Sequence, residues 1–466
     1  MDFKRSLAGL RPNCALGPRV HINTITSTLD ANTIYGSTKA IADQLRTFSG
    51  GQMKVQDVFA SMGLKPLLPK QLIRPDLDCF GRPNADTYCF FGGDERVNEQ
   101  PTLTALHTLY VRDHNRVAKR LAQLNPHWDD DRIYHETRHI EAALVQHILI
   151  SEYLPLLIGH DMMIKYNLTA APPNTYWNGY DPSVTPSISQ GFSTAAFRQG
   201  HTFIQGKVRF YDSRTFEFVG SMMLRSLFKR PFHYYKPGRV DEVVAGIINT
   251  PAQVYDPFVT EEISGHLFQE PGESFGMDLP AINLARGREQ GVPGYNAYRK
   301  WCGLGAVKSF AELQPLMANR TAVLYSKLYK HVDDIDLWSG GISERRMAGS
   351  QIGPTFACII ARQFSSIKRG DRFWFENSGF PSAFTLDQLR EIKKATQARL
   401  LCYNSDNLLT IQQQALKLPH PIYNPRIRCS DVPDLDLRYW LEEPTKPGSF
   451  FTSPSFRTQI DSSEES

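Results

Sequence analysis

The sequence lacks an uninterrupted apolar run long enough to cross a membrane. Its most apolar stretch, residues 142–159, is broken by Gln146, His147 and Glu152, so we expect no membrane-spanning helix. The first residues, Met1 to Ser6, contain no apolar core of the kind found in a signal peptide. The net charge is only +4, from 52 Lys and Arg against 48 Asp and Glu, which is too small to indicate nucleic acid or an anionic membrane as a partner.

The sequence also lacks internal repeats and linker-like segments. Hydrophobic residues make up 41% of the 466 residues and charged residues 21%, which is typical of a globular protein. Only from about Thr445 does the composition turn to Ser, Thr, Pro and Glu. We therefore predict one domain over residues 1–444 and a disordered tail over residues 445–466.

Apolar residues recur mostly with helical spacing. The pattern predicts long helices over residues 102–125 and from the acidic triplet at 129–131 to about Pro155, with shorter ones over 240–248, 311–329 and 386–398. Strand-like alternation is brief, as at residues 207–210. The predicted fold class is all-α: one large, mostly helical domain with long irregular loops and little β-structure.

Cysteine occurs seven times, and an odd number leaves at least one thiol without a partner in the chain. Two sequons, at Asn167 and Asn319, fit a glycosylated exterior. An extracellular composition without a signal peptide leads us to expect that an N-terminal part is missing. The cysteines are Cys14, Cys79, Cys89, Cys302, Cys358, Cys402 and Cys429.

Two short motifs have a functional and a structural interpretation. Residues 135–139 read HETRH and match the zinc-protease pattern H-E-x-x-H. Ala142 and Val145 stand where a metzincin needs glycine and histidine, so we favour a solvated helix face. Residues 369–371 read RGD but run into an aromatic segment, which favours a turn over an adhesive loop.

Six motifs that are separated along the chain carry chemistry when taken together. They include GDERVNEQ at 93–100, HTLYVRDHNR at 107–116, STAAFRQGH at 193–201, MDLPAINLARGR at 277–288 with GVPGYN at 291–296, DLWSGG at 336–341 and DRFWFEN at 371–377. In this order they resemble the animal haem peroxidases, the superfamily of myeloperoxidase, lactoperoxidase and peroxidasin. The resemblance extends from about Cys14 to about Leu441.

The resemblance implies haem b as a cofactor and assigns its binding residues. His201 matches the proximal iron ligand, and Asn283 matches the residue that takes the hydrogen bond of the other ring nitrogen. Arg198 and Arg286 match positions near the haem propionates, where a guanidinium suits a carboxylate.

On the peroxide side, Arg96 matches the distal catalytic arginine, which polarises bound peroxide. Glu99 matches the carboxylate that forms an ester with a haem methyl group. Gln100 stands where myeloperoxidase has its sulfonium methionine, so we expect no link there.

Residues 25–32 match the family's calcium loop. Thr26, Thr28, Asp30 and Asn32 would offer oxygen ligands to a hard cation. By spacing alone, the same residues could form an exposed turn.

Two departures from the family pattern stand out. The chain has REQG at 288–291 where the family usually has Arg-Asp-His-Gly. The distal histidine, in an Asp-His-Asp context, would precede the calcium loop, and His21 is not in that context. Without that imidazole we expect turnover to fall by orders of magnitude.

The resemblance also implies the disulfides Cys79–Cys89, Cys302–Cys358 and Cys402–Cys429. Cys14 would pair with a cysteine that lies before Met1 in the family. We therefore favour a gene-model fragment of a longer peroxidase over a truncated paralogue.

The function implied is a secreted haem peroxidase that reduces hydrogen peroxide while oxidising a halide, thiocyanate or phenolic donor. The alternative is a catalytically inactive haem-peroxidase-like protein with an extracellular-matrix or cell-surface partner in adhesion or matrix assembly.

Overall fold

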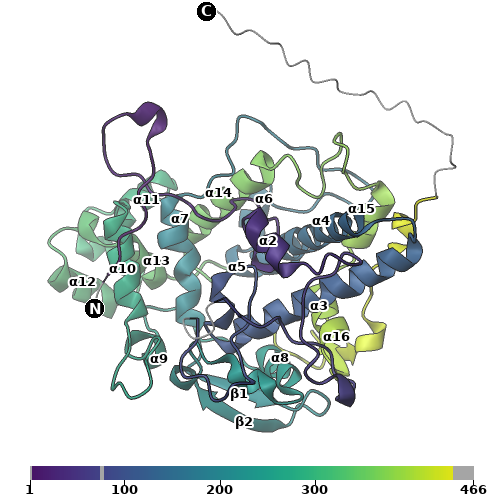
Figure 1. Cartoon of the computed structure of the whole chain (residues 1–466). Helices are drawn as coiled ribbons and strands as arrows, with labels where there is room; N and C mark the ends of the chain where they lie inside the picture. Colours follow the sequence, from purple (N-terminus) through teal and green to yellow (C-terminus); the bar gives the residue numbers. More distant parts are fainter. Residues whose placement is uncertain (1–2, 74–77, 444–466) are drawn as a thin grey trace, which may run out of the picture.

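Two long helices, α3 (Pro101–Leu124) and α4 (Asp130–Ile148), run through the molecule and pack against each other (Figure 1). Helix α3 begins where the Gln100 side chain accepts a hydrogen bond from the backbone N–H of Thr102, and a proline occupies its first position. Helix α4 is capped by the Asp129 carboxylate, which accepts from the backbone N–H of Arg132 at 2.8 Å. The computed structural model describes residues 3–73 and 78–443, so the predicted tail at 445–466 lies outside it.

The polypeptide continues from α4 through one π-helical turn, Leu149–Tyr153, into α5 (Leu154–Ile158) and α6 (His160–Lys165). The predicted end at Pro155 is therefore three residues too early: Pro155 follows directly after the π-helical turn as the second residue of α5, and the helical segment continues past it to Ile158. Within the described residues, the segment Asp130–Ile158 is long and apolar enough to cross a membrane by length and composition alone, but 56% of its most apolar window is buried. Since Ile140, Leu144 and Leu154 lie in the main core, we interpret it as a core helix.

Shorter helices surround this pair, and β-structure is confined to two small antiparallel ladders in the described residues. The prediction of an all-α fold is confirmed. The ladders are β1 (Lys207–Tyr211) with β2 (Phe218–Met223), and β3 (Thr410–Gln412) with β4 (Arg426–Arg428). The remaining helices are α1 (Asn32–Tyr35), α2 (Lys39–Leu45), α7 (Gln190–Thr194), α8 (Arg239–Asn249), α9 (Glu261–Ser264), α10 (Leu279–Glu289), α11 (Tyr295–Trp301), α12 (Asn319–Leu328), α13 (Leu337–Ser343), α14 (Pro354–Gly370), α15 (Leu386–Ile392) and α16 (Gln397–Asn404).

Two predicted helices are each broken in the structure. The run predicted over 311–329 is a 3₁₀ turn, Phe310–Leu313, followed by α12, and Pro315 lies between them. The run predicted over 386–398 divides into α15 and α16, because the Thr396 hydroxyl caps a new helix by accepting from the backbone N–H of Arg399. The strand predicted at 207–210 is present as β1.

The main core is centred on α14, where Phe356 and Ile360 are fully buried in a cluster that also contains residues of α4, α5 and the aromatic segment with Trp374. A second core lies beneath α3, α8 and α16 and includes Leu109 and Val244. All three predicted disulfides are present, while Cys14 is exposed and forms none. Two of the disulfides, Cys302–Cys358 and Cys402–Cys429, tie separate elements together.

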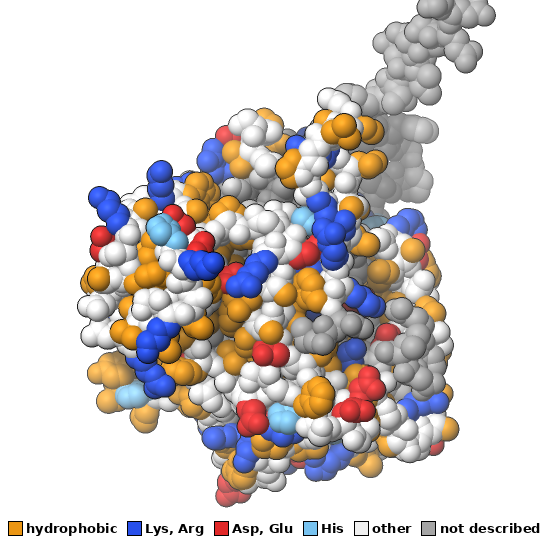
Figure 2. Space-filling view, turned by 90° about the vertical axis from the view of Figure 1, so that its left-hand side faces the viewer, with side chains coloured by type: hydrophobic (Ala, Val, Ile, Leu, Met, Phe, Trp, Pro, Cys, Tyr) orange, Lys and Arg blue, Asp and Glu red, His pale blue; other side chains and the backbone are white. Residues whose placement is uncertain are grey.

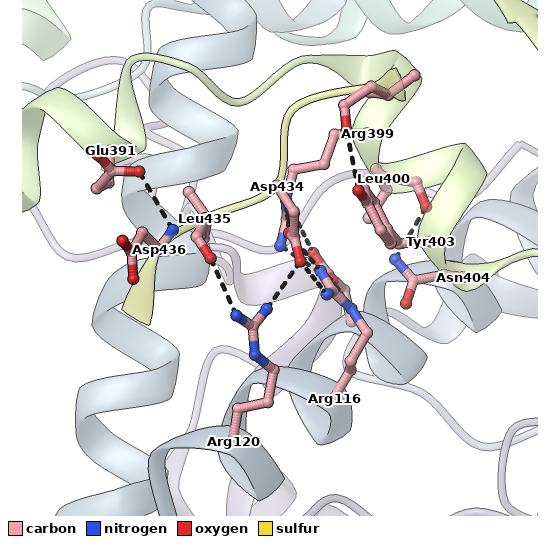
Figure 3. Close-up of polar contacts among 12 residues, drawn as sticks. Arg116, Arg120, Glu391, Arg399, Leu400, Tyr403, Asn404, Asp434, Leu435 and Asp436 are labelled. Carbon is pink, nitrogen blue, oxygen red and sulfur yellow. Dashed lines mark hydrogen bonds and ion pairs between the residues drawn. The ribbon is translucent and has the colours of Figure 1, made fainter. Parts of the chain in front are cut away.

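Ion pairs hold residues 432–440 against α3 and α16 (Figure 3). The carboxylate of Asp434 accepts from Arg116 and Arg120 of α3, both at 2.7 Å, and from Arg399 of α16 at 2.9 Å. Arg399 also pairs with the fully buried Asp113 at 2.6 Å. Burial alone would raise the pKa of Asp434, but the guanidinium groups of Arg116 and Arg399 hold it far below its usual range. We call Asp113, Arg116, Arg120, Arg399 and Asp434 the carboxylate–arginine cluster.

Candidate active site

A mostly apolar cavity of about 610 Å³ lies between the start of α3, α8, β1 and the segment from α9 to α10. These elements meet in the lower half of Figure 1. Its size is in the range of small-molecule and cofactor sites, which is about 300–1,000 Å³. Two functional groups, the imidazole of His201 and the carboxyl of Glu99, face this same cavity. Its apolar walls include Leu103, Leu224, Phe228, Ile263, Leu267 and Leu279.

His201 is positioned by the 3₁₀ segment Ala196–Phe203, which follows α7 directly. Its Nδ1 atom accepts a hydrogen bond from the Nδ2 atom of Asn283 at 2.9 Å. Burial, together with the positive charge of Arg198, lowers the pKa of His201 to about 4. The imidazole is therefore neutral at physiological pH and keeps a lone pair, as an iron ligand must.

Asn283 lies on α10, is 0% exposed, and connects His201 to Arg198. Its Oδ1 atom accepts from the Nη1 atom of Arg198 at 2.9 Å. The side-chain amide is therefore held from both sides. An iron ligand coordinating through Nε2 carries its proton on Nδ1, which then needs an acceptor. Binding iron would require the amide of Asn283 to turn its oxygen towards His201, and Arg198 would then have to give up its present bond.

Arg198 and Arg286 are positively charged groups close enough to influence one another. Burial and the charges of Arg286 and Arg96 lower the pKa of Arg198 to about 10. Arg286 donates to the carbonyl of Lys4 at 2.9 Å and to the carboxylate of Glu289 at 3.0 Å. A cluster of cations beside an apolar cavity favours an anionic ligand.

Several charged and polar side chains lie together just before α3 and in its first turns. Arg96 is bound in the structure to Asp94, its own capping neighbour, and its side chain is 58% exposed. Burial raises the pKa of Glu99. Burial also lowers the pKa of His107 to about 4, and its Nδ1 atom is buried without a hydrogen-bond partner in the described part of the chain. His107 is thus a neutral imidazole within the electrostatic influence of Arg96 and Asp94.

Residues 1–416 match the family described as animal haem peroxidase. The chain is 38% identical over 437 residues to thyroid peroxidase of Sus scrofa, covering 92% of this chain and 46% of the relative. It is 35% identical to a peroxidase of Drosophila melanogaster, covering 95% of this chain and 63% of that protein. The solved structure of peroxidase A from Dictyostelium discoideum superposes with a TM-score of 0.74 at 29% identity, covering 89% of this chain and 77% of the other.

The chain belongs to the animal haem peroxidase family. It spans about half the length of the thyroid peroxidase and under two thirds of the fly peroxidase. Membership implies haem, and the residues present fit that group. An apolar cavity receives both a neutral imidazole and a carboxyl, and Arg198, which binds the partner of that imidazole, lies within the electrostatic influence of Arg286 and Arg96.

The structure brings the residues of the predicted calcium loop into one turn. The Asp30 carboxylate accepts from the Thr26 hydroxyl at 2.9 Å and from the backbone N–H of Asn32 at 3.1 Å. Thr28 lines a neighbouring cavity of about 440 Å³ together with Asp30 and Asp371. Burial raises the pKa of Asp371, and the charge of Asp30 adds to this. Calcium takes six to eight oxygen ligands, so these residues alone offer fewer oxygens than a complete calcium shell needs.

The two alternative motifs have structural roles, but the expectation of a solvated helix face at H-E-x-x-H is wrong for Glu136 and His139, which are partly buried against other segments. Glu136 of the H-E-x-x-H match accepts from the indole N–H of Trp440 at 3.1 Å, and His139 stacks on Phe384. No group of three or more potential protein ligands for a metal occurs in residues 3–73 and 78–443. In the RGD segment, Asp371 is 6% exposed and Arg369 pairs with Asp181 at 2.8 Å. The turn interpretation therefore agrees with the structure.

Sequence reasoning gave no role to several residues that the structure places at the site. Glu289 and Gln290, in the stretch that departs from the family pattern, both bind the Ser6 side chain. His21 lies 3.6 Å from Glu289 and contacts Gln190, so it belongs to this N-terminal contact. These contacts join residues more than 160 positions apart and leave no local signal in the sequence.

Proposed function

We propose that this chain binds haem b through His201 and acts as a peroxidase on hydrogen peroxide. The observation that carries the proposal is the hydrogen-bonded series His201–Asn283–Arg198 at a cavity that also receives Glu99. Haem, when bound, would supply an iron that accepts the oxidising equivalents of peroxide. The electron donor would be a halide, thiocyanate or a phenol.

On the proximal side, His201 would hold the iron through Nε2 while Asn283 accepts the proton of Nδ1. Accepting that hydrogen bond increases the basicity of the imidazole and fixes its orientation. Arg198, once released from Asn283, would be free to pair with a haem propionate, and Arg286 would do the same if it left Glu289. Haem binding and a rearrangement of these two arginines are thus expected to occur together.

On the peroxide side, Arg96 would orient peroxide and stabilise negative charge as the O–O bond breaks. A base must also move a proton from one peroxide oxygen to the other. The sequence contains no Asp-His-Asp triplet, so we propose that this chain turns over slowly. The alternative, an inactive haem-binding protein in adhesion or matrix assembly, predicts no turnover above that of free haem.

Further parts of the proposal concern covalent attachment, calcium and location. Glu99, which lines the cavity, would form one ester with a haem methyl group; hydrogen peroxide would be the two-electron oxidant and would be reduced to water as the methyl carbon loses a hydrogen and gains the carboxylate oxygen. Gln100 already caps α3, so no third link is proposed. Thr26, Thr28, Asp30 and Asn32 would bind calcium. The disulfides favour an oxidising, extracellular location.

Absorbance of the purified chain with added haem tests the proposal. We expect a Soret band that shifts on binding in the wild type and is lost in His201→Ala. The matched control is His160→Ala, an exposed histidine on α6. Oxidation of guaiacol by peroxide, measured against equimolar free haem, then separates the peroxidase from the inactive alternative. Equal Soret bands in wild type and His201→Ala would contradict the assignment of the iron ligand.

A further inference from the structure

The loop that joins β3 to β4 presents large apolar side chains to solvent. It spans residues 413–425, and we call it the β3–β4 loop. Ile422 and Tyr423 are 77% and 81% exposed, and Leu416 and Leu418 are exposed as well. Leaving side chains of this size in water forgoes the free energy that their burial would release. A group of exposed apolar side chains of this kind indicates an interaction surface.

Hydrogen bonds hold the β3–β4 loop in one conformation. The backbones of His420 and Asn424 exchange two hydrogen bonds, of 2.9 and 3.1 Å. The buried side chain of Asn424 accepts from the backbone N–H of Gln414 at 3.0 Å and donates to the carbonyl of Leu418 at 3.1 Å. The Nδ1 atom of His420 accepts from the backbone N–H of Ile422 at 3.2 Å. The apolar side chains are therefore presented by a pre-formed loop, which lowers the entropic cost of binding a partner.

The base of the loop is fixed to the body of the molecule. The strands β3 and β4 form an antiparallel ladder, and the disulfide Cys402–Cys429 connects α16 to the residue after β4. The guanidinium of Arg426 lies 3.3 Å from the centre of the Phe216 ring and donates to the Asn249 side chain at 2.8 Å. Arg426 is therefore engaged in contacts within the chain.

The charge around the loop has one sign. Residues 407–430 contain no Asp or Glu and three cations, Lys417, Arg426 and Arg428. Lys417 and Arg428 are exposed and form no ion pair with the part of the chain that the structure describes. The acidic residue just before this stretch, Asp406, is buried. The net charge of +4 gives no indication of this surface, because it averages over basic and acidic segments.

Exposed apolar side chains beside unpaired cations are complementary to a membrane surface with anionic lipids. An aliphatic side chain and a tyrosine ring are stabilised at the boundary between headgroups and acyl chains, and a lysine there is attracted to anionic headgroups. Protein interfaces, in contrast, are depleted in lysine. We propose that the β3–β4 loop binds the surface of a membrane that contains anionic phospholipids, with Ile422 and Tyr423 inserted among the headgroups and Lys417 beside them.

Helix α12 provides a comparison within the same molecule. It lies at the left of Figure 1, on the side that Figure 2 turns towards the viewer, where apolar and charged side chains are interspersed. Its Val323 and Leu324 are exposed apolar residues, and its Lys327 is an exposed cation. These residues are of the same kinds as those of the loop but lie along the flank of a helix, so they supply matched controls.

Co-sedimentation of the full chain, with haem added, with phospholipid vesicles tests the proposal. We expect binding to vesicles of phosphatidylcholine with about one third phosphatidylserine, and much weaker binding to phosphatidylcholine alone. The variant Ile422→Ser/Tyr423→Ser should bind the mixed vesicles at least about tenfold more weakly, because it removes the inserted apolar groups. Lys417→Gln should bind them about fivefold more weakly, the effect of one charge near such a surface.

The controls carry the same changes on α12. Val323→Ser/Leu324→Ser and Lys327→Gln should bind the mixed vesicles like the wild type. Raising the salt concentration from about 0.1 M to 1 M shortens the range of electrostatic attraction, so it should weaken the wild type more than Lys417→Gln. The chain without haem should bind as the loaded chain does, since no residue of the β3–β4 loop lines the cavity that receives His201.

Three results would overturn the proposal. One is equal binding to the two kinds of vesicle, and another is wild-type binding by Ile422→Ser/Tyr423→Ser with near-ultraviolet circular dichroism unchanged. The third is absence of binding to either kind of vesicle, which would leave the loop to a protein partner. An equal loss of binding in Val323→Ser/Leu324→Ser would move the membrane contact to α12 and contradict the proposal as well.

Discussion

Asn283 donates a hydrogen bond from Nδ2 to the Nδ1 atom of His201 across 2.9 Å. This relationship places the amide where it controls which ring nitrogen carries the proton. Replacing Asn283 by Leu removes that control while keeping side-chain volume. We expect haem affinity to fall about 10- to 100-fold, the usual effect of losing a partner of a metal-binding histidine. Haem titration followed at the Soret maximum measures it, and unchanged affinity would falsify the positioning role.

Arg96 offers a test of the peroxide side. Its exposed guanidinium is bound to Asp94 rather than to the cavity walls, so Arg96→Gln should leave haem binding intact. The rate constant for reaction of the haem-loaded chain with peroxide should fall about 10²- to 10³-fold, as for loss of a group that stabilises developing charge. Stopped-flow absorbance gives this rate. Glu95→Gln, in the same turn, is the control and should react like wild type.

Acid should destabilise the haem-free chain over a defined pH window. Six histidines have a pKa lowered to about 4 by burial: His107, His114, His139, His147, His201 and His233. Unfolded histidine titrates near 6.5. Between these values the unfolded state binds more protons than the folded state, so the free energy of unfolding falls as pH drops from about 6.5 to 4.

The variant His139→Phe isolates one of these groups. His139 stacks on Phe384 with ring centroids 4.1 Å apart, so phenylalanine keeps the contact and removes the titration. Urea unfolding at pH 7 and pH 5 should show a smaller loss of stability on acidification in this variant than in the wild type. If the two losses are equal, burial does not depress the pKa of His139.

The disulfide between Cys302, at the end of α11, and Cys358 on α14 closes a loop of 56 residues. The double variant Cys302→Ser/Cys358→Ser should lose about 2–5 kcal/mol of unfolding free energy. Cys14→Ser is the matched control, because Cys14 is exposed and forms no disulfide within the described residues. Denaturant titration measures the free energy of unfolding of each variant. An equal loss of unfolding free energy in Cys14→Ser would contradict the stabilising role given to the disulfide.

Removing the shared carboxylate of the carboxylate–arginine cluster should release residues 432–440 from α3 and α16. Asp434→Asn leaves Arg116, Arg120 and Arg399 without a shared counter-ion (Figure 3). Breaking such a partly buried network should cost a few kcal/mol, about 3–5 in buried pairs, and should expose residues 432–440 to limited proteolysis.

The control for this variant lies two residues away. Asp436 pairs with Arg438 at the surface, and such pairs contribute little. Asp436→Asn should therefore resist proteolysis as the wild type does. Rapid cleavage of both variants at the same site would show that the segment depends on local charge in general rather than on the cluster.

The sequence allowed correct predictions for features that a short run of residues determines by itself. Proline and a capping side chain at Gln100 determine where α3 begins, and the six motifs identify the family and hence the cysteine pairs. Periodicity was misleading at 311–329, because an apolar stripe does not reveal that Pro315 separates two short helices.

The remaining features depend on contacts between distant segments. The bond between Arg198 and Asn283 joins residues 85 apart, and the contact of Ser6 with Glu289 joins residues 283 apart.

The carboxylate–arginine cluster also has a consequence for synthesis of the chain. Arg116 leaves the ribosome 318 residues before Asp434, its partner, which corresponds to roughly 15–60 s at about 5–20 residues per second. During that interval Asp113, Arg116 and Arg120 have no second carboxylate with which to close the network, and Arg399 is itself translated only 35 residues before Asp434. Stable packing of α16 on α3 therefore has to wait for nearly the whole domain to be translated, so the nascent chain needs protection from aggregation until then.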